Sequence, residues 1–153
     1  RTGGDVARLT SEAWRLGAVS GIPGLKTAYV DSSCPVAISL DEPGSRFLLE
    51  RISRFDRLFS SNLLEAELKA ALAREGSRGR LGNFLSWLRW VYPYQRLTRE
   101  MEQVLETGLL RGPDLWHLAC ALLLRSRLKE EMFFLTLDGR QSDVARALGF
   151  RVL

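Results

Sequence analysis

The sequence predicts a three-layer α/β/α sandwich around a mainly parallel sheet. Short β-prone runs alternate with segments whose apolar residues recur at helical spacing, which is typical of strands joined by crossover helices. The run at 132–137 is apolar enough for a strand that is buried on both faces of a sheet. With 153 residues, 46% of them apolar, the chain has the size of one domain and can bury a core of its own.

The first half of the predicted domain contains two strands and three helices. The first strand ends at Asp31, and the first long helix begins after the Pro43-Gly44 turn, with Phe47 on its apolar face. Ser61 follows the second strand and can cap the next helix. The expected order is strand 27–30, helix 35–40, a helix from 45, strand 57–60 and helix 62–74.

The second half adds four helices and two strands. Pro93 ends the first of these helices, Thr98 can cap the second, and Pro113 stands in the first turn of the third. Asp138 follows the long apolar strand at a turn. The expected order is helix 81–90, helix 99–110, a helix from 112, strand 132–137, helix 141–148 and strand 150–153.

Residues 1–25 differ from the rest of the chain and are expected to form an N-terminal arm outside a domain at 26–153. Glycines flank a short helical pattern at 5–16. The arm is read as an inert extension, with a segment that covers a groove as the alternative. It lacks the continuous apolar stretch of a signal peptide, so we expect a cytoplasmic protein.

Charge and hydropathy restrict the partners. The longest uninterrupted apolar run, 118–124, is far shorter than the roughly 20 residues of a membrane span, so no membrane insertion is expected. The formal net charge is +4, and 19 of the cationic side chains are Arg against 3 Lys. Arginine suits phosphate contacts, although genome composition can also give this excess. Cys34 and Cys120 stand among apolar neighbours and are expected to be buried.

Four separated acids are expected to meet at one edge of the sheet. Asp31 and Asp138 end strands, Asp114 lies in the first turn of a helix, and Glu67 lies about two turns into another helix. Ligands of an open parallel sheet bind beyond the carboxyl ends of its strands. Clustered carboxylates repel one another, so such a group usually holds a cation. Oxygen ligands favour Mg²⁺ or Mn²⁺, and a two-ion site of this kind can hydrolyse a phosphodiester.

Four short motifs resemble the PIN-domain ribonucleases, most closely the VapC-type toxins of toxin–antitoxin pairs. They occur in the order of that family, and the resemblance covers about residues 26–153. The motifs are Tyr29-Val30-Asp31-Ser32-Ser33, Ser61-Asn62-Leu63-Leu64-Glu65-Ala66-Glu67-Leu68, Pro113-Asp114-Leu115-Trp116-His117-Leu118-Ala119, and Thr136-Leu137-Asp138 with Ala147-Leu148-Gly149-Phe150.

The resemblance implies a Mg²⁺- or Mn²⁺-dependent endoribonuclease that hydrolyses RNA phosphodiester bonds. Asp31 and Asp138 match the principal metal ligands of the family, while Glu67 and Asp114 match acids that hold a second ion or orient water. Ser33 matches a hydroxyl residue that supports the first Asp. The partners implied are an RNA substrate, a cognate antitoxin and a second copy of the chain in a homodimer.

Several assignments keep an alternative. Glu65 competes with Glu67 for the helical acid; Glu67 is preferred because Ala66 and Leu68 flank it as in the family pattern. His117 is read as a packed helix residue rather than as a ligand. Stacking of RNA bases is one reading of the aromatic and cationic stretch at 87–96, and an apolar helix face or a dimer interface is the preferred one.

Two further interpretations concern RNA. Arg78 and Arg80, in a glycine-rich loop, are candidates for contact with RNA phosphates, or else solvated charges. The alternative to an enzyme is a non-catalytic PIN-like module that binds RNA or a protein.

Overall fold

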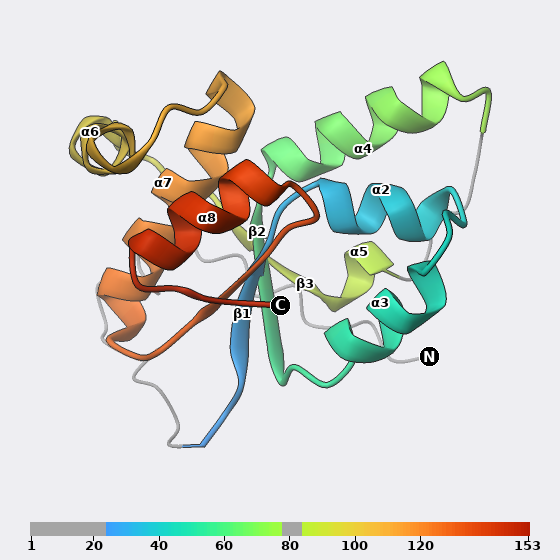
Figure 1. Ribbon diagram of the computed structural model, residues 1–153, viewed down its shortest axis with the longest axis horizontal. Helices are drawn as coiled ribbons and strands as arrows, with labels where there is room; N and C mark the ends of the chain where they lie inside the picture. The colour runs from blue at the N-terminus through green and yellow to red at the C-terminus, as the bar shows by residue number, and fades with distance from the viewer. Residues whose placement is uncertain (1–23, 78–83) are drawn as a thin grey trace.

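A five-stranded, all-parallel sheet forms the middle layer of the molecule (Figure 1). The computed structural model describes residues 24–77 and 84–153. The spatial order of the strands is β3-β2-β1-β4-β5, so β1 is central. The strands are β1 (Thr27–Val30), β2 (Arg57–Ser61), β3 (Leu88–Val91), β4 (Phe133–Leu135) and β5 (Arg151–Val152).

Helices cover both faces of the sheet, as Figure 1 shows. One face packs against α2 to α5 and the other against α6 to α8. The predicted α/β/α class is therefore confirmed. The helices are α2 (Ser33–Ser39), α3 (Ser45–Ile52), α4 (Leu63–Arg74), α5 (Phe84–Trp87), α6 (Thr98–Thr107), α7 (Gly112–Leu128) and α8 (Gly139–Ala147).

The alternation of side chains along β1 creates two separate cores. Tyr29 points into the core beneath α6 to α8, whereas Ala28 and Val30 point into the core beneath α2 to α5. All three side chains are fully buried. The central strand is thus packed on both faces, and any group at its carboxyl end is fixed by the two layers of helices.

The main error of the sequence prediction lies at 81–90, which was expected to be one helix. The described part of this segment forms the single turn α5 and then the edge strand β3. Leu88 and Val91 are buried while Arg89 is exposed, and all three lie beside β2. Backbone pairing with β2 outweighs the helical spacing of the apolar residues, because strand preference depends mainly on tertiary context.

Three smaller expectations were also wrong. Ser61 is the last residue of β2, and Asn62 takes the N-cap position of α4 without a side-chain hydrogen bond. Thr98 lies inside α6, where Leu97 is the N-cap residue. Phe47 is 63% exposed and not on the buried face of α3. Pairing and packing with neighbouring elements move helix ends by a residue or two from where local rules put them.

Some predicted features lie outside the described residues. These are nearly all of the arm at 1–25, including the helical pattern at 5–16, and the candidate RNA contacts Arg78 and Arg80. Both cysteines are buried and free, as expected. Within 24–77 and 84–153, no helix is long and apolar enough to cross a membrane.

A buried ion pair connects the start of β2 to the loop before β4. Arg57 donates from Nη2 to both carboxylate oxygens of Glu130, at 2.6 and 2.8 Å. The Arg57 side chain is 7% exposed. By contrast, the neighbouring pair of Glu131 with Arg151 spans 3.8 Å between largely exposed side chains. The two adjacent glutamates thus differ in how much the fold depends on them.

We predict that Glu130→Gln lowers the free energy of unfolding by about 3 kcal/mol, because it leaves the buried Arg57 charge without a counter-charge. Glu131→Gln is the matched control and should change stability by less than about 0.5 kcal/mol. Urea denaturation measures both. Equal effects of the two substitutions would contradict the prediction.

Candidate active site

The four acids singled out in the sequence line one pocket at the carboxyl edge of the sheet. Asp31 follows β1, Asp138 follows β4, Glu67 comes from α4 and Asp114 from the first turn of α7. The pocket has a volume of about 540 Å³. The strand order explains the convergence, because β1 and β4 are neighbours and their carboxyl ends share one edge. Acids as far apart in the sequence as Asp31 and Asp138 are thereby brought to the same cavity.

Asp31 is the most enclosed of these acids. The residue is only 3% exposed to solvent. Burial raises its pKa from 3.8 to about 6, although hydrogen bonds from Ser33 and the nearby His117 act in the opposite direction. Keeping a carboxylate charged is unfavourable when it is buried away from water and has no counter-charge. The site therefore gains stability from any cation that neutralises Asp31.

Ser33 connects the ends of the two neighbouring strands. Its hydroxyl donates to Oδ1 of Asp31 at 2.5 Å and accepts a hydrogen bond from the backbone N–H of Leu137 at 2.8 Å. The backbone N–H of Ser33 also donates to Oδ1 of Asp31, at 3.1 Å. Both donors of Ser33 thus bind the same oxygen, Oδ1, and a hydrogen bond from the Thr136 side chain also lowers the pKa of this carboxylate.

Gln141, which sequence reasoning missed, holds Asp138 and Asp114 in relation to each other. Oδ1 of Asp138 accepts from the backbone N–H of Gln141 at 2.7 Å, which caps α8. The Gln141 amide donates to the backbone carbonyl of Asp114 at 3.2 Å and accepts from the Thr136 hydroxyl at 2.7 Å. Gln141 is completely buried. The only feature of the sequence that points to Gln141 is its position three residues after Asp138, where a backbone N–H can bond to an N-cap side chain.

Glu67 is positioned by a chain of buried hydrogen bonds. Oε2 of Glu67 lies 2.7 Å from Nε2 of His117, and Nδ1 of His117 lies 2.9 Å from the Tyr29 hydroxyl. That hydroxyl accepts from the backbone N–H of Ser61 at 3.1 Å. Burial raises the pKa of Tyr29 well above 10.0, so the phenol keeps its proton and can donate a hydrogen bond to Nδ1 when Nε2 carries the ring proton. The network therefore assigns the Nε2–H tautomer to His117, with Glu67 as acceptor.

The position of His117 agrees with the sequence interpretation only in part. It is a fully buried helix residue, as expected, but it also orients one of the four acids. Glu65, the competing helical acid, is absent from the pocket wall and pairs with Lys69 at 2.6 Å on the exposed side of α4. Since Glu65 and Glu67 are two residues apart in a helix, they cannot face the same side.

Asp114 lies nearer to solvent and is influenced by the other acids. Its pKa is raised, first by burial and also by the negative charges of Asp138 and Glu67, while Arg111 lowers it. The Arg111 side chain is 86% exposed and its Nε lies 3.6 Å from Oδ2 of Asp114. The Arg111 charge thus offsets part of the repulsion from the other acids, and burial is the main cause of the raised pKa.

The donor set suits a hard divalent cation. The pocket offers carboxylate and hydroxyl oxygens, which Mg²⁺ and Mn²⁺ prefer, and no thiolate lines it. Within the described ranges, no three Asp, Glu, His or Cys side chains are close enough together to hold one ion. This spacing is compatible with Mg²⁺, which is usually bound by one or two carboxylates and several waters. The donor chemistry of the residues therefore fits the ion, whereas their spacing in the described residues does not by itself supply three ligands for it.

A comparison with protein-family models decides the family. The model of the PIN domain matches residues 28–147, which is most of the chain. The chain belongs to the PIN domain family. Among curated proteins, none matches it. PIN domains are typically metal-dependent nucleases, so membership indicates nuclease-type activity in general terms. The matched segment includes all four acids of the pocket.

We predict that Asp31→Asn stabilises the metal-free PIN domain at neutral pH by about 1 to 3 kcal/mol, since the amide removes a buried charge whose pKa is raised from 3.8 to about 6. A raised pKa means that Asp31 favours folding below pH 4, and that this contribution is lost as the pH rises through 6. The stability gained by the substitution should therefore shrink towards pH 4. Thermal melting in EDTA measures it.

The control for this prediction is Asp143→Asn, which removes the same charge from an exposed carboxylate on α8. It should shift the melting temperature little at any of these pH values. A destabilised Asp31→Asn protein at neutral pH would show that the hydrogen bonds to Ser33 outweigh the cost of burying the charge.

We predict that Tyr29→Phe lowers the free energy of unfolding by about 1 to 3 kcal/mol, because it leaves the buried Ser61 N–H and Nδ1 of His117 without their partner. Tyr92→Phe, at a half-exposed tyrosine, is the matched control and should change stability by less than about 0.5 kcal/mol. Guanidinium denaturation of both variants provides the measurement. A Tyr29→Phe protein as stable as wild type would refute the role of this chain of hydrogen bonds.

Proposed function

We propose that this PIN domain is a Mg²⁺- or Mn²⁺-dependent endoribonuclease that hydrolyses phosphodiester bonds of RNA. The observation that carries the proposal is the pocket at the carboxyl edge of the sheet, which is lined by Asp31, Glu67, Asp114 and Asp138. The raised pKa of Asp31 supports it, since burying an acid without a counter-charge is unfavourable unless a function requires it.

The residues have distinct roles in this proposal. Asp31 and Asp138 would hold the principal ion, and Glu67 and Asp114 would hold a second ion or orient water. When bound, the ions would lower the pKa of water and neutralise charge on the phosphate. Ser33 binds Oδ1 of Asp31 and so fixes the orientation of the carboxylate. His117 keeps Glu67 from turning out to solvent.

Cationic side chains at the rim of the pocket suit a nucleic acid. Arg74 and Arg111 line the same pocket as the acids. An adjoining pocket of about 320 Å³ shares Asp114 and Asp138 and adds Arg140 and the 69% exposed Leu109. These guanidinium groups can contact phosphates on both sides of the acids, and the apolar side chain can pack against a base.

The finer proposal is that the protein is the toxin of a VapBC-type toxin–antitoxin pair. It rests on the order of the four sequence motifs, which resembles that of VapC-type toxins. A cognate antitoxin would then cover the acidic pocket, and a second copy of the chain would complete a homodimer. Such a toxin acts on RNA in the cytoplasm, so the predicted location goes with this proposal.

One observation favours a second candidate, a non-catalytic PIN-like module that binds RNA or a protein. Within the described residues, no three potential ligands are close enough together to hold one ion. A module that had lost catalysis would keep the acids without the ability to bind metal. The two candidates differ in whether Mn²⁺ stabilises the protein, because a ligand raises stability only by binding the folded state.

We predict that the purified protein cleaves structured RNA in millimolar Mn²⁺ or Mg²⁺, and that EDTA abolishes the cleavage. Asp31→Asn and Asp138→Asn should each lower the cleavage rate by at least about 100-fold, because each removes a charge that the ion requires. Asp143→Asn is the control for preparation and folding, and should keep full activity. Gel analysis of end-labelled RNA measures the rates.

Cleavage that survives EDTA, or that is equal in the wild type and both variants, would reject the nuclease. If there is no cleavage, a melting temperature that does not change with millimolar Mn²⁺ supports the binding module, whereas a rise that Asp31→Asn removes supports the metal site with a substrate other than the RNA tested.

A further inference from the structure

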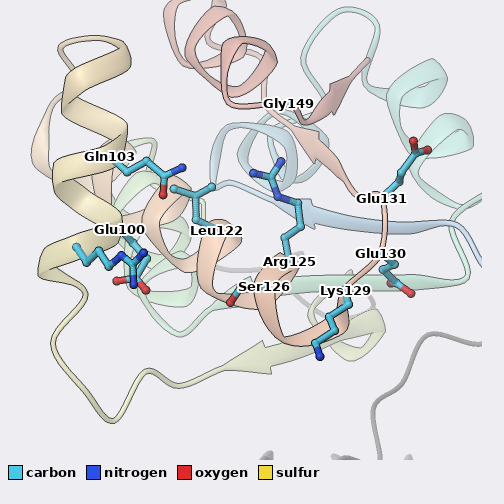
Figure 2. A pocket seen from close by; sticks show the side chains of 10 residues that line it. Glu100, Gln103, Leu122, Arg125, Ser126, Lys129, Glu130, Glu131 and Gly149 are labelled. Carbon is cyan, nitrogen blue, oxygen red and sulfur yellow. The ribbon is translucent and has the colours of Figure 1, made fainter.

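A second pocket lies at the edge of the sheet opposite the four acids, and it is larger than the first. Its volume is about 620 Å³, within the range of small-molecule sites. Figure 2 shows it between α6, the carboxyl-terminal half of α7 and the loop that leads to β4. Arg125 stands in its wall, eleven residues along α7 from Asp114, which is roughly 16 Å along the helix axis.

Arg125 is held in a fixed orientation without an acidic partner. Its Nη2 donates to the backbone carbonyl of Leu148 at 2.9 Å, and its guanidinium lies 4.1 Å from the centre of the Phe150 ring. Burial lowers its pKa. Within the part of the chain that the structure describes, Arg125 forms no ion pair. A partly buried, preorganised guanidinium beside a cavity is a ready receptor for an oxyanion.

Three carboxylates line this pocket, and two of them contact an arginine outside the pocket wall. Glu130 is bound by Arg57, and Glu131 is a largely exposed carboxylate with only a 3.8 Å contact to Arg151. Figure 2 shows both carboxylates turned away from Arg125. Glu100 is the one remaining carboxylate of the pocket wall, and within the described residues it has no ion-pair partner.

The local charge therefore suits a dianion. Arg99, Arg125 and Lys129 line the pocket and form no ion pair within the described residues, so with Glu100 they leave two positive charges. A phosphate monoester carries close to two negative charges at neutral pH. Gln103, which points towards Arg125 in Figure 2, adds an amide that can bond a hydroxyl or a ring nitrogen.

We propose that this pocket is a binding site for a phosphate monoester of nucleotide size, with Arg125 on the phosphate and with Lys129 and Arg99 elsewhere in the pocket wall. The pocket is open to solvent, and its volume of about 620 Å³ is large enough for a mononucleotide. A long polyanion such as an RNA strand is less suited, because it would have to run past the carboxylates of Glu130 and Glu131, which line the same pocket. The site is independent of the nuclease proposal, since none of its residues belongs to the acidic pocket.

The test is isothermal titration calorimetry of the full chain in EDTA and at constant ionic strength, with inorganic phosphate, adenosine 5′-monophosphate and adenosine as separate probes. We expect the monophosphate to bind with at least tenfold higher affinity than inorganic phosphate, because the pocket also contacts the rest of the nucleotide. Adenosine alone should not bind measurably. EDTA keeps metal out, so failure of the nuclease proposal leaves this result unaffected.

Two variants locate the site. Arg99→Gln with Lys129→Gln should weaken binding of the monophosphate at least tenfold without disturbing the core, since both side chains are exposed. Arg74→Gln with Arg140→Gln removes the same charge at the acidic pocket and should leave binding unchanged. Equal weakening by the two double variants, or no binding of either phosphate probe to the wild type, would overturn the proposal. Equal affinity for inorganic phosphate and the monophosphate would overturn the assignment to a nucleotide. The pocket would then be a site for simple oxyanions only.

Discussion

The structure depends on the burial of one carboxylate at the end of its central strand. Asp31 follows β1, which has a strand on each side and helices on both faces, so the side chain has almost no access to water. The fold therefore carries an electrostatic cost at the position where a cation would be useful. Ser33 and the N–H of Leu137 limit this cost by fixing the carboxylate, and they tie β1 to β4 at the same time.

The other acids are positioned by groups that do not themselves line the pocket. Gln141 joins the turn that bears Asp138 to the first turn of α7. The ring of His117 is hydrogen-bonded to the carboxylate of Glu67. Each of these side chains is fully buried and fully engaged, so the acids can vary little in position even though they repel one another. Rigid supports of this kind are what keep like charges within one cavity.

Much of the fold could be predicted from sequence because local pattern and tertiary structure agree. The runs at 27–30 and 57–60 are β-prone and become paired central strands, while β3 was missed because its apolar residues also fit a helix. The convergence of the four acids followed from the edge rule for parallel sheets. The roles of Gln141 and Tyr29 could not be predicted, since each depends on which side chain lies opposite in space, and no local pattern encodes that partner.

The pairing of β1 with β4 also determines when the acidic pocket can exist. Ala28 lies opposite Phe133, so strands more than 100 residues apart in sequence must pair before Asp31 and Asp138 share an edge. Contacts of such long range form late in folding, because the entropy of closing the intervening loop must be overcome first. During synthesis, a chain that still lacks β4 holds Asp31 without its neighbour. The acidic pocket therefore cannot be assembled until nearly all of the domain has been translated.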